Sequence, residues 1–288
     1  KALKLAEQTG SPQLTAKVQL ALCDVYANTG NADGDDVCKG AIGTFEQLGM
    51  PQMAANAHSA RARMAQNANN LELARDAFLS ALTMREEKVH ERLRDENKRV
   101  HDLANLCQVE MRMQLQGALH RCREAKKGIE EIAPDNKAMQ AATNYAVGNS
   151  AANEGNPDEA VTHLEKAASI YEKADPTDLA MLGDVYLRLG AVHTNEGDKK
   201  KAAEAFKKGV DHLAEADQKA LLPTLVQLRT QYAQMQLNRE KWKEVAKHLK
   251  KVAAEASEAD DTHTRAWAFS ALARAQNNLG DHDAAKMS

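Results

Sequence analysis

The side chains best suited to chemistry in this chain are amides, which share one helical face with a few charged and aromatic residues. An Asn or Gln side chain both donates and accepts hydrogen bonds, so a ladder of amides can bond the backbone of an extended peptide while nearby Arg residues select its charge. The chemistry predicted is therefore recognition of a partner in a groove. The residues assigned to this groove are Asn149, Asn153, Asp184, Arg188, Asn195, Gln227, Gln231, Gln234, Asn238, Trp267, Arg274 and Asn278. The same pattern continues toward the N-terminus at Lys17, Asp24, Asn28, Asn56, Arg63 and Asn67.

A structural role competes with ligand binding at the recurrent asparagines. Those that lie two residues before an expected turn are Asn28, Asn67, Asn195, Asn238 and Asn278. At that position an Asn side chain can bond the carbonyl groups freed at a helix end. Asn149 instead lies in the middle of an expected helix, where turn chemistry does not apply. Binding is therefore the favoured role for Asn149, and the same argument extends to Arg188, Gln231 and Arg274.

Catalytic and metal-binding motifs are missing from the sequence. It contains no His-Glu-x-x-His pair, no Gly-rich phosphate loop followed by Lys and Ser or Thr, and no Gly-x-Ser-x-Gly elbow. The ten histidines are scattered, and none is spaced from Cys or carboxylates as a metal ligand would be. We expect neither enzymatic activity nor a bound metal or cofactor.

An Asn-x-Gly sequence recurs along the chain and marks an internal repeat. Its copies lie at Asn28–Gly30, Asn153–Gly155, Asn195–Gly197 and Asn278–Gly280. When Asn69, Glu240 and the weakly matching Met113 are included, turns are expected at 30, 69, 113, 155, 197, 240 and 280. Their spacing of 39 to 44 residues is typical of a stacked solenoid, in which each unit buries its apolar face only against its neighbours.

Residues on either side of each turn define the unit as helix, turn, helix. Seven residues before the turn, six of the seven units carry a small residue, and the exception is Leu106. Apolar residues follow five, nine and twelve residues after the turn, which places them on one helical face. In the first unit a shift moves the Ala and Phe pair to Ala41 and Phe45. Small residues of the first helix are therefore expected to receive large residues of the second.

Two copies carry the pattern most clearly, LRLGAVHTNEGDKKKAAEAFKKG from Leu187 and YAVGNSAANEGNPDEAVTHLEKA from Tyr145. They resemble the tetratricopeptide repeat, and the resemblance covers essentially the whole chain. It implies an all-α, right-handed α-solenoid of about seven stacked units, with ligands on a concave surface lined by the first helices. The common repeat has about 34 residues, so these units look more like the long repeats of kinesin light chain, spindle-orientation adaptors, ciliary assembly proteins and bacterial peptide-sensing regulators. Asn149 is similar to the Asn of Leu-Gly-Asn in the long-repeat adaptors that hold peptide backbone.

Composition fits this architecture. A hydrophobic content of 43% with only 4% aromatic residues suits Ala-rich helix packing and disfavours a sheet sandwich. We expect one superhelical domain over residues 1–288, cut short at both ends. Residues 85–102 are rich in charge and contain no Gly or Pro. They are expected to form a projecting helix or, as the alternative, a solvated connector.

The four cysteines, Cys23, Cys38, Cys107 and Cys122, show no Cys-x-x-Cys spacing. Cys23 and Cys122 occupy packing positions of the repeat, and a free Cys in a core behaves as a small hydrophobic residue. No secretory leader and no apolar stretch long enough to cross a membrane are found in the sequence, so an intracellular location is expected. We therefore expect four reduced thiols in place of disulfides or a metal site.

The formal net charge of -3 argues against a nucleic-acid-binding body, in which a basic face would dominate. Lysines are nevertheless concentrated on two successive second helices. This convex basic strip comprises Lys200, Lys201, Lys207, Lys208, Lys243, Lys247, Lys250 and Lys251. It is either a solvated outer face or a contact for an acidic partner.

These observations predict a non-catalytic protein-protein interaction scaffold. The groove is expected to hold an extended or helical partner segment, within a cytoskeletal, motor or ciliary assembly in the cytoplasm. One alternative is a peptide-responsive sensor or regulator whose output domain lies outside this segment. A purely structural subunit of a large complex is the other alternative.

Overall fold

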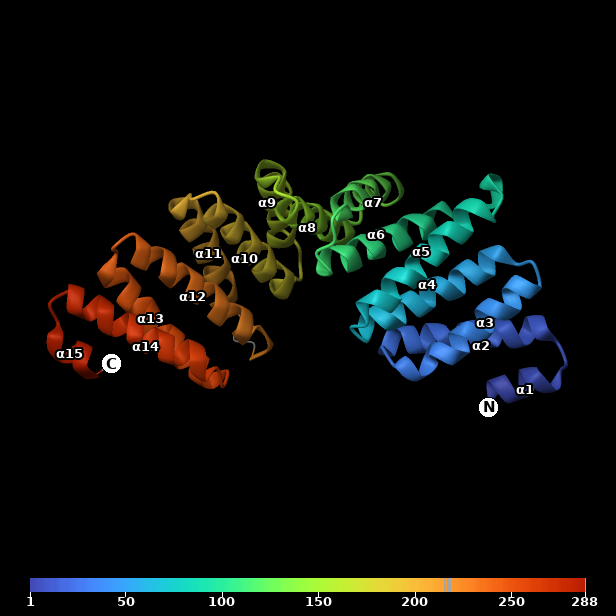
Figure 1. Cartoon of the computed structure of the whole chain (residues 1–288), viewed down its shortest axis with the longest axis horizontal. Coiled ribbons are helices and arrows are strands. Elements are labelled where there is room, and N and C mark those ends of the chain that lie inside the picture. Colours follow the sequence, from blue (N-terminus) through green and yellow to red (C-terminus); the bar gives the residue numbers. More distant parts are fainter. Residues whose placement is uncertain (215, 217–218, 288) are drawn as a thin grey trace. The chain divides into compact units, whose positions relative to one another are not determined.

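The computed structural model describes residues 1–214, 216 and 219–287. Within these residues the chain forms helices and turns and no strand (Figure 1). The first helices of the repeats are α2 (Pro12–Thr29), α4 (Pro51–Asn67), α6 (Glu96–Arg112), α8 (Lys137–Asn153), α10 (Leu179–Asn195), α12 (Leu222–Asn238) and α14 (Thr262–Asn278). The second helices are α3 (Asp35–Gln47), α5 (Leu71–Glu87), α7 (Ala118–Ile132), α9 (Pro157–Glu172), α11 (Lys199–Ala214), α13 (Trp242–Glu258) and α15 (His282–Met287). The predicted all-α array of helix-turn-helix units is confirmed.

The remaining elements are short. The helix α1 (Ala2–Gln8) precedes the first pair and packs on α2. Three turns of 3-10 helix lie between longer helices, η1 (Ala32–Gly34), η2 (Glu91–Leu93) and η3 (Lys219–Leu221). The sequence predicted one domain, whereas the chain divides into two compact units, Lys1–Glu154 and Gly155–Ser288. They are called unit 1 and unit 2 below, and each is described by itself.

The turns within the helix pairs share one backbone conformation. Six of the seven predicted turn positions carry a residue with positive φ, namely Gly30, Asn69, Gly155, Gly197, Glu240 and Gly280. This left-handed conformation ends helices and favours Gly or Asn, because other side chains clash there with the backbone. In the third pair the left-handed residue is Gln114, with a φ of 54°, and not Met113. When the repeat is counted from Gln114, the small residue seven positions earlier is Cys107, so the exception at Leu106 disappears.

Helix starts follow from capping residues. The side chains that accept a hydrogen bond from the backbone N–H three residues later belong to Ser11, Asn70, Asp95, Asn136, Asp178, Asp198, Asp261 and Asp281. Each satisfies one of the N–H groups that have no partner within the helix. Pro12, Pro51 and Pro157 lie in the first turn of their helices, where a missing N–H costs nothing. The local sequence therefore fixes where most helices begin.

The core uses the predicted contact between small and large residues. In unit 2 a Cβ atom at Gly190 of α10 would overlap the ring of Phe206 on α11, so only Gly allows this approach. In unit 1 the shifted pair Ala41 and Phe45 is buried in one cluster with Ala16 and Ala54. Burial of these apolar faces is the main force that holds successive helices together.

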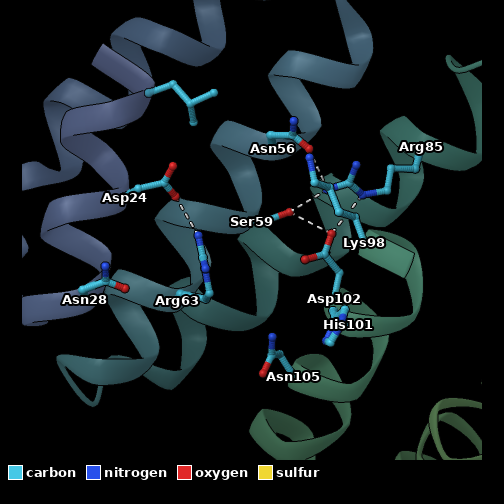
Figure 2. Close-up of a pocket in the computed structure, with 11 residues that line it drawn as sticks. Asp24, Asn28, Asn56, Ser59, Arg63, Arg85, Lys98, His101, Asp102 and Asn105 are labelled. Atoms are coloured by element: carbon cyan, nitrogen blue, oxygen red, sulfur yellow. Dashed lines mark hydrogen bonds and ion pairs between the residues drawn. The ribbon is translucent and has the colours of Figure 1, made fainter. Parts of the chain in front are cut away.

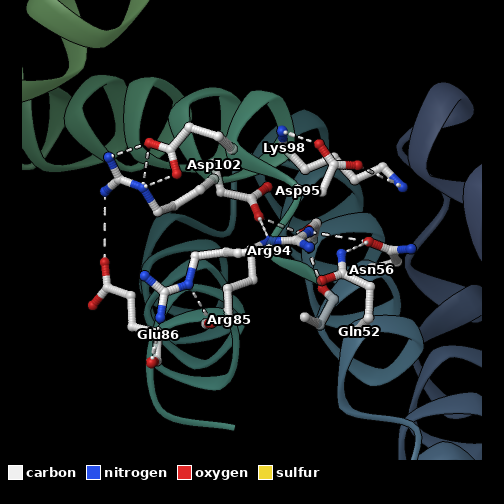
Figure 3. Close-up of polar contacts among 12 residues, drawn as sticks. Gln52, Asn56, Arg85, Glu86, Arg94, Asp95, Lys98 and Asp102 are labelled. Atoms are coloured by element: carbon white, nitrogen blue, oxygen red, sulfur yellow. Dashed lines mark hydrogen bonds and ion pairs between the residues drawn. The ribbon is translucent and has the colours of Figure 1, made fainter. Parts of the chain in front are cut away.

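Residues 85–102 do not form the projecting helix that the sequence favoured. α5 ends at Glu87 and α6 begins at Glu96, although no Gly or Pro interrupts the segment. Arg94 explains the stop, since its side chain donates to the carbonyl groups of Arg85 at 3.0 Å and Glu86 at 2.8 Å (Figure 3). It thereby satisfies carbonyls that the end of α5 leaves free. Val89 is buried and anchors the connecting segment.

The expectation of four reduced thiols is wrong. Cys23 on α2 is bonded to Cys38 on α3, and Cys107 on α6 is bonded to Cys122 on α7. Both disulfides join the two helices of one pair, and both have a sequence separation of 15 residues. The sequence shows no Cys-x-x-Cys pair because the partners lie on two facing helices, and the structure shows which cysteines face each other.

Candidate functional site

Unit 1 contains a cavity of about 650 Å³ between its first helices. Polar and charged side chains from α2, α4 and α6 converge on it, together with Arg85 from α5 (Figure 2). The lining consists of Leu20, Asp24, Asn28, Asn56, Ser59, Arg63, Arg85, Lys98, His101, Asp102 and Asn105. Its volume falls in the range of about 300–1,000 Å³ that is usual for ligand sites. Leu20 is the single aliphatic lining residue, so the site suits a polar ligand.

A buried ion pair stabilises the inner part of this cavity. The Arg85 side chain is fully buried and donates from Nε to Asp102 Oδ2 at 3.0 Å. Its Nη2 donates to Asn56 Oδ1 and to Ser59 Oγ, both at 3.1 Å. Ser59 in turn donates to Asp102 Oδ2 at 2.7 Å. The network links α4, α5 and α6, as Figures 2 and 3 show.

The electrostatics of the pair are set by burial. Burial raises the pKa of the Asp102 carboxyl, and the positive charge of Arg85 with the hydrogen bond from Ser59 acts in the opposite direction. Arg85 Nη1 is buried and has no hydrogen-bond acceptor among the described residues. An unsatisfied buried donor costs about 1–3 kcal/mol. Arg85 is therefore a fixed cation whose hydrogen-bonding capacity is incompletely used.

The outer part of the cavity holds exposed charges. Arg63 Nη2 lies 2.7 Å from Asp24 Oδ1, and Lys98 Nζ lies 3.6 Å from Asp95 Oδ2. The side chains of Arg63 and Lys98 are 45% and 50% exposed, so these pairs contribute only about 0–1 kcal/mol each. His101 is also exposed. These cations can exchange their partners for a ligand at little cost.

The residues that the sequence assigned to a groove fall in both units. In unit 2 the neighbouring first helices α10 and α12 carry Asp184 with Arg188, and Gln227 with Gln231, at corresponding positions. None of these four makes a hydrogen bond or ion pair to another described residue, and three of them are exposed, Arg188 being half-buried. Desolvation by the neighbouring protein atoms and the nearby negative charge of Asp178 raise the pKa of Asp184. Unit 2 therefore presents unpartnered polar side chains on its first helices.

Other groove candidates have partners within the chain. Gln234 donates to Asn238 at 3.2 Å, and the Asn278 amide donates to the carbonyl of Arg274 at 2.8 Å. In unit 1 the Asn67 amide donates to the carbonyl of Ala27 at 2.7 Å, at the end of α2. Two of the five recurrent asparagines, Asn67 and Asn278, thus bond helix carbonyls: Asn67 at the end of the neighbouring helix α2, and Asn278 one turn earlier in its own helix.

The last groove candidates differ in exposure. Asn153 and Asn195 lie exposed at the ends of α8 and α10. Asn149 is buried, and its Oδ1 atom has no hydrogen-bond partner in the described part of the chain. The remaining two lie on α14, where Trp267 packs against the core and Arg274 lies with its guanidinium carbon 6.0 Å from the centre of the Trp242 ring.

Four lining residues of the cavity had been recognised in the sequence as an extension of the groove pattern, Asp24, Asn28, Asn56 and Arg63. The sequence did not identify the α6 residues, and the cause is the turn placed at Met113. Counting back nine and thirteen residues from Gln114 gives Asn105 and His101, both lining residues. Arg85 had no comparable signal, because it reaches the cavity from a second helix.

The convex basic strip lies on α11 and α13, and all eight of its lysines are exposed. On α11, Lys200 and Lys207 pair with carboxylates of the same helix, and Lys201 pairs with Asp198, which directly precedes the helix. The lysines of the strip without an ion pair to a described residue are Lys208, Lys243, Lys247, Lys250 and Lys251. The α13 part of the strip therefore keeps the greater excess of positive charge.

Similarity to known proteins follows the repeat. The family model described as "Soluble NSF attachment protein, SNAP" matches residues 122–269, just over half of the chain. The chain belongs to the soluble NSF attachment protein family. The matched segment of this SNAP-family chain begins at Cys122 on α7 and ends within α14. No curated protein matches the chain by sequence.

Solved structures share the fold at low sequence identity. The apo form of RapI is 11% identical with a TM-score of 0.70, over 94% of this chain and 71% of that one. The apo form of the quorum sensor NprR from B. thuringiensis is 10% identical with a TM-score of 0.63, over 99% and 89%. A structure of Podospora anserina putative kinesin light chain TPR-like repeats is 17% identical with a TM-score of 0.51, over 67% and 92%. The resemblance to long TPR-like repeats is thereby confirmed for the fold.

The described helices were also compared with the requirements for crossing a membrane and for binding a metal. None of them combines the length and the apolar character that a membrane span requires. Within the same residues, no group of three or more His, Cys, Asp or Glu side chains is arranged to hold a metal ion.

Proposed function

We propose that this SNAP-family chain is a non-catalytic interaction module that holds a protein segment on the surface of its first helices. The observation that carries the proposal is the alignment of unpartnered polar side chains on neighbouring first helices, Asp184 and Arg188 beside Gln227 and Gln231. Side chains that make no internal contact are free to bond a partner. The family name, which describes an attachment protein, supports the same function.

The proposed working surfaces are the first-helix faces of the two units, each taken by itself. Asn195 and Asn238 lie at the ends of α10 and α12 in unit 2, and Asn153 lies at the end of α8 in unit 1. The convex basic strip is a second surface, suited to an acidic partner because its α13 lysines lack internal ion pairs. Nucleic acid is not proposed as a partner, since the net charge is -3.

The assembly served by this adaptor is proposed to be cytoskeletal, motor or ciliary, on the basis of the long-repeat likeness to kinesin light chain. A peptide-responsive regulator is the runner-up, supported by the fold likeness to a quorum sensor. A ligand-driven decrease in the radius of gyration, measured by small-angle scattering, would favour the regulator. A purely structural subunit would leave the first-helix surface empty.

The two disulfides bear on the proposed cytoplasmic location. Disulfides persist mainly in oxidising compartments, whereas cytosolic reductants keep thiols reduced. A cytoplasmic adaptor therefore requires that Cys23, Cys38, Cys107 and Cys122 be reduced in the cell. Alkylation of the protein in its native source, followed by mass spectrometry, distinguishes four free thiols from none.

The function is tested by cross-linked capture of partners from the native source. The groove variant replaces Arg188, Gln231 and Arg274 by Ala. A second variant replaces Lys243, Lys247 and Lys250 of the convex basic strip by Gln. Both variants must melt at the wild-type temperature. Loss of a partner from the groove variant alone supports the proposal. Retention of every partner by the groove variant, with loss from the lysine variant, would transfer the function to the convex strip.

A further inference from the structure

We propose that the second helix α13 is a docking surface for an acidic segment of a partner protein, held at one end by a single large apolar side chain of that segment. The inference deepens the part of the proposed function that concerns the convex basic strip, and it does not depend on the groove. Three features of α13 support it: a row of lysines without partners, a helix start that opposes positive charge, and a pocket at the end of the row.

The lysines of α13 form a row on one face of the helix. Lys243, Lys247 and Lys250 recur at intervals of four and three residues, which places them side by side on the exposed face. The neighbouring Lys251 is exposed as well, and none of the four pairs with a described residue. Like charges at this spacing repel each other. An acidic partner segment therefore relieves a repulsion that already exists along α13.

The glutamates of α13 do not compensate the row, because two of them bind α12 instead. Glu244 accepts a hydrogen bond from the hydroxyl group of Tyr232. Glu255 Oε2 accepts a hydrogen bond from Nε of Arg229 at 2.7 Å. Tyr232 and Arg229 are both buried, so these contacts hold the two carboxylates on the side of α13 that faces α12. The third glutamate, Glu258, is the last residue of the helix. The row thus keeps its positive charge.

The start of α13 is unfavourable for positive charge. A helix N-terminus carries a partial positive charge, which negative side chains stabilise and positive side chains oppose. α13 nevertheless begins after Lys241, which provides no side-chain cap, and Lys243 follows in the first turn, where the acidic Glu244 is bonded to α12. At the corresponding position before α11, Asp198 Oδ1 accepts from the N–H of Lys201 at 2.9 Å. α13 lacks this compensation, and an acidic partner can provide it.

A pocket of about 330 Å³ lies at the N-terminal end of the row, between α13 and the end of α14. Its lining consists of Glu240, Lys241, Trp242, Lys243, Glu244 and Leu279. Two lysines and two glutamates balance each other, so the pocket itself selects no charge. Trp242 is half-buried and Leu279 is 49% exposed, and both offer apolar surface. Because Lys243 belongs to the pocket and to the row, an apolar side chain in the pocket would lie next to the acidic residues of the same segment.

The form of this surface favours a protein segment over an anionic lipid surface. The row from Lys243 to Lys250 rises about 10 Å along the helix axis, at 1.5 Å per residue. Carboxylates at positions i, i+4 and i+7 of a partner helix recur with the same rise, so all three can face the lysines at once. Lipid headgroups attract lysines wherever these lie near the membrane. A lipid surface therefore accounts for the lysines and not for the pocket.

Fluorescence polarisation of the full chain with labelled helical peptides tests the proposal. The acidic peptide carries Glu at positions i, i+4 and i+7 and a Leu one turn beyond each end of this row, so either orientation presents a Leu to the pocket. A second peptide has Gln in place of the three Glu, and a third has Ala in place of both Leu. Three exposed ion pairs predict that the Gln peptide binds about tenfold more weakly than the acidic peptide. Burial of one Leu predicts a loss of about tenfold for the Ala peptide also.

Variants assign the two contributions to the two parts of the surface. The α13 variant, with Lys243, Lys247 and Lys250 replaced by Gln, should lose the preference for Glu over Gln and keep the preference for Leu over Ala. Leu279→Ala should keep the first preference and reduce the second. Its matched control is Leu48→Ala, at an exposed Leu of unit 1 outside the pocket.

The matched control for the α13 variant removes three lysines of α11 that already have carboxylate partners. These lysines are Lys200, Lys201 and Lys207, each replaced by Gln. The α11 variant has the same net charge as the α13 variant, and it should bind all three peptides as the wild type does.

Trp242 provides a direct readout of the pocket. In Trp267→Phe it is the only tryptophan of the chain. Unlabelled acidic peptide should shift its emission to shorter wavelength, because a Leu side chain then excludes water from the ring, and the Ala peptide should not. An emission that stays unchanged at saturation with the acidic peptide would overturn the placement of the apolar side chain.

Equal binding of the acidic and Gln peptides by the wild type would overturn the proposal. So would an equal loss in the α11 variant, because net charge alone would then explain the preference. Vesicles of phosphatidylserine and phosphatidylcholine represent the competing partner. If the vesicles bind through the α13 lysines and the acidic peptide does not bind, the surface contacts lipid and the proposal is wrong.

The same measurements separate this proposal from the groove. If no peptide binds while partner capture depends on Arg188, Gln231 and Arg274, the docking surface is excluded and the proposed groove function stands. If the acidic peptide binds as expected while capture does not depend on those residues, the docking surface stands and the groove fails.

Discussion

Unit 1 and unit 2 join the helices of a pair by different means at corresponding positions. In unit 1 the sites seven residues before the left-handed turn residue in two pairs are Cys23 and Cys107, each bonded to a Cys on the second helix. In unit 2 the same site of the α10 pair is Gly190, on which the Phe206 ring packs. One solution uses a covalent bond and the other uses close packing. The repeat requires only that two helices approach closely, and the chemistry of the contact is free to vary.

The units also differ in how they bury charge. Unit 1 encloses the Arg85–Asp102 pair and a second carboxylate, Glu110, which accepts from Arg75 at 3.1 Å and from Arg121 at 2.6 Å. In unit 2 Arg229 is also buried, and its partner Glu255, at 2.7 Å, is 19% exposed. Buried pairs confer geometric specificity more than stability. Unit 1 therefore has the features of a rigid site, which matches the position of the cavity.

The two tryptophans, Trp242 and Trp267, both lie in unit 2. Tryptophan fluorescence therefore reports the unfolding of unit 2, whereas far-ultraviolet circular dichroism reports both units. This difference allows each prediction below to be assigned to one unit. A single free energy of unfolding is not assumed, because a chain of two units need not unfold in one step.

The largest effect is expected from Asp102→Leu, which leaves the Arg85 charge buried without its partner. Loss of one partner of a buried pair costs about 3–5 kcal/mol. In urea unfolding, the transition of unit 1 should shift to lower urea. Circular dichroism should show this shift, and tryptophan fluorescence should not. The control is Arg85→Met combined with Asp102→Leu, which removes both charges and should recover most of the loss. An equal shift of the fluorescence transition would contradict the independence of the two units.

The next effect is expected from loss of a disulfide. Cys107→Ser with Cys122→Ser opens a loop with a sequence separation of 15 residues, which predicts a loss of about 3 kcal/mol. Reduction of the wild type should destabilise unit 1 while the fluorescence transition of unit 2 stays in place. A variant with all four Cys replaced by Ser should not respond to reductant. If reduction leaves the wild type unchanged, the disulfides do not stabilise unit 1.

Gly190→Leu should destabilise unit 2, whereas the two preceding changes destabilise unit 1. A side chain at this position meets the Phe206 ring, and overpacking costs about 1–3 kcal/mol. The fluorescence transition should therefore shift to lower urea. Glu204→Leu on the exposed side of α11 adds the same side chain without a clash and serves as the control. Unchanged unfolding of Gly190→Leu would show that the proposed repeat register is incorrect in unit 2.

The smallest effect is expected on the pH dependence of stability. Burial lowers the pKa of His58 in unit 1 and of His248 in unit 2 below the ordinary value of 6.5. The folded protein therefore binds these protons less readily than the unfolded chain, so stability is full above pH 6.5 and falls as the pH decreases through the lowered pKa values. His58→Gln should reduce the loss of stability at low pH when unfolding is followed by circular dichroism, and should leave the fluorescence transition unchanged. His248→Gln should reduce the loss in both measurements. If both variants lose stability at low pH as the wild type does, carboxylates and not these histidines cause the loss.

The sequence predicted most of the turns because most of them have a local cause, although Glu240 adopts the left-handed conformation without being Gly or Asn. A left-handed residue is needed at the end of each first helix, and Gly or Asn supplies it at Gly30, Asn69, Gly155, Gly197 and Gly280. At Gln114 the residue type gives no such signal, and the register was displaced by one residue. That displacement concealed Asn105 and His101, because on a helix one residue turns the expected face by about 100°. Part of the cavity could therefore have been predicted from a correct turn.

The sequence by itself determined the helix-turn-helix repeat, its period, its packing positions and the polar faces of its first helices. These properties depend on the spacing of residues along one helix, which is a local quantity. Only the tertiary structure decided that Cys23 meets Cys38, that α5 ends at Glu87 because Arg94 bonds its carbonyls, and that Arg85 and Asp102 meet beneath a cavity. Each of these depends on side chains from different elements reaching one point in space, a relationship that the spacing within a single helix does not encode.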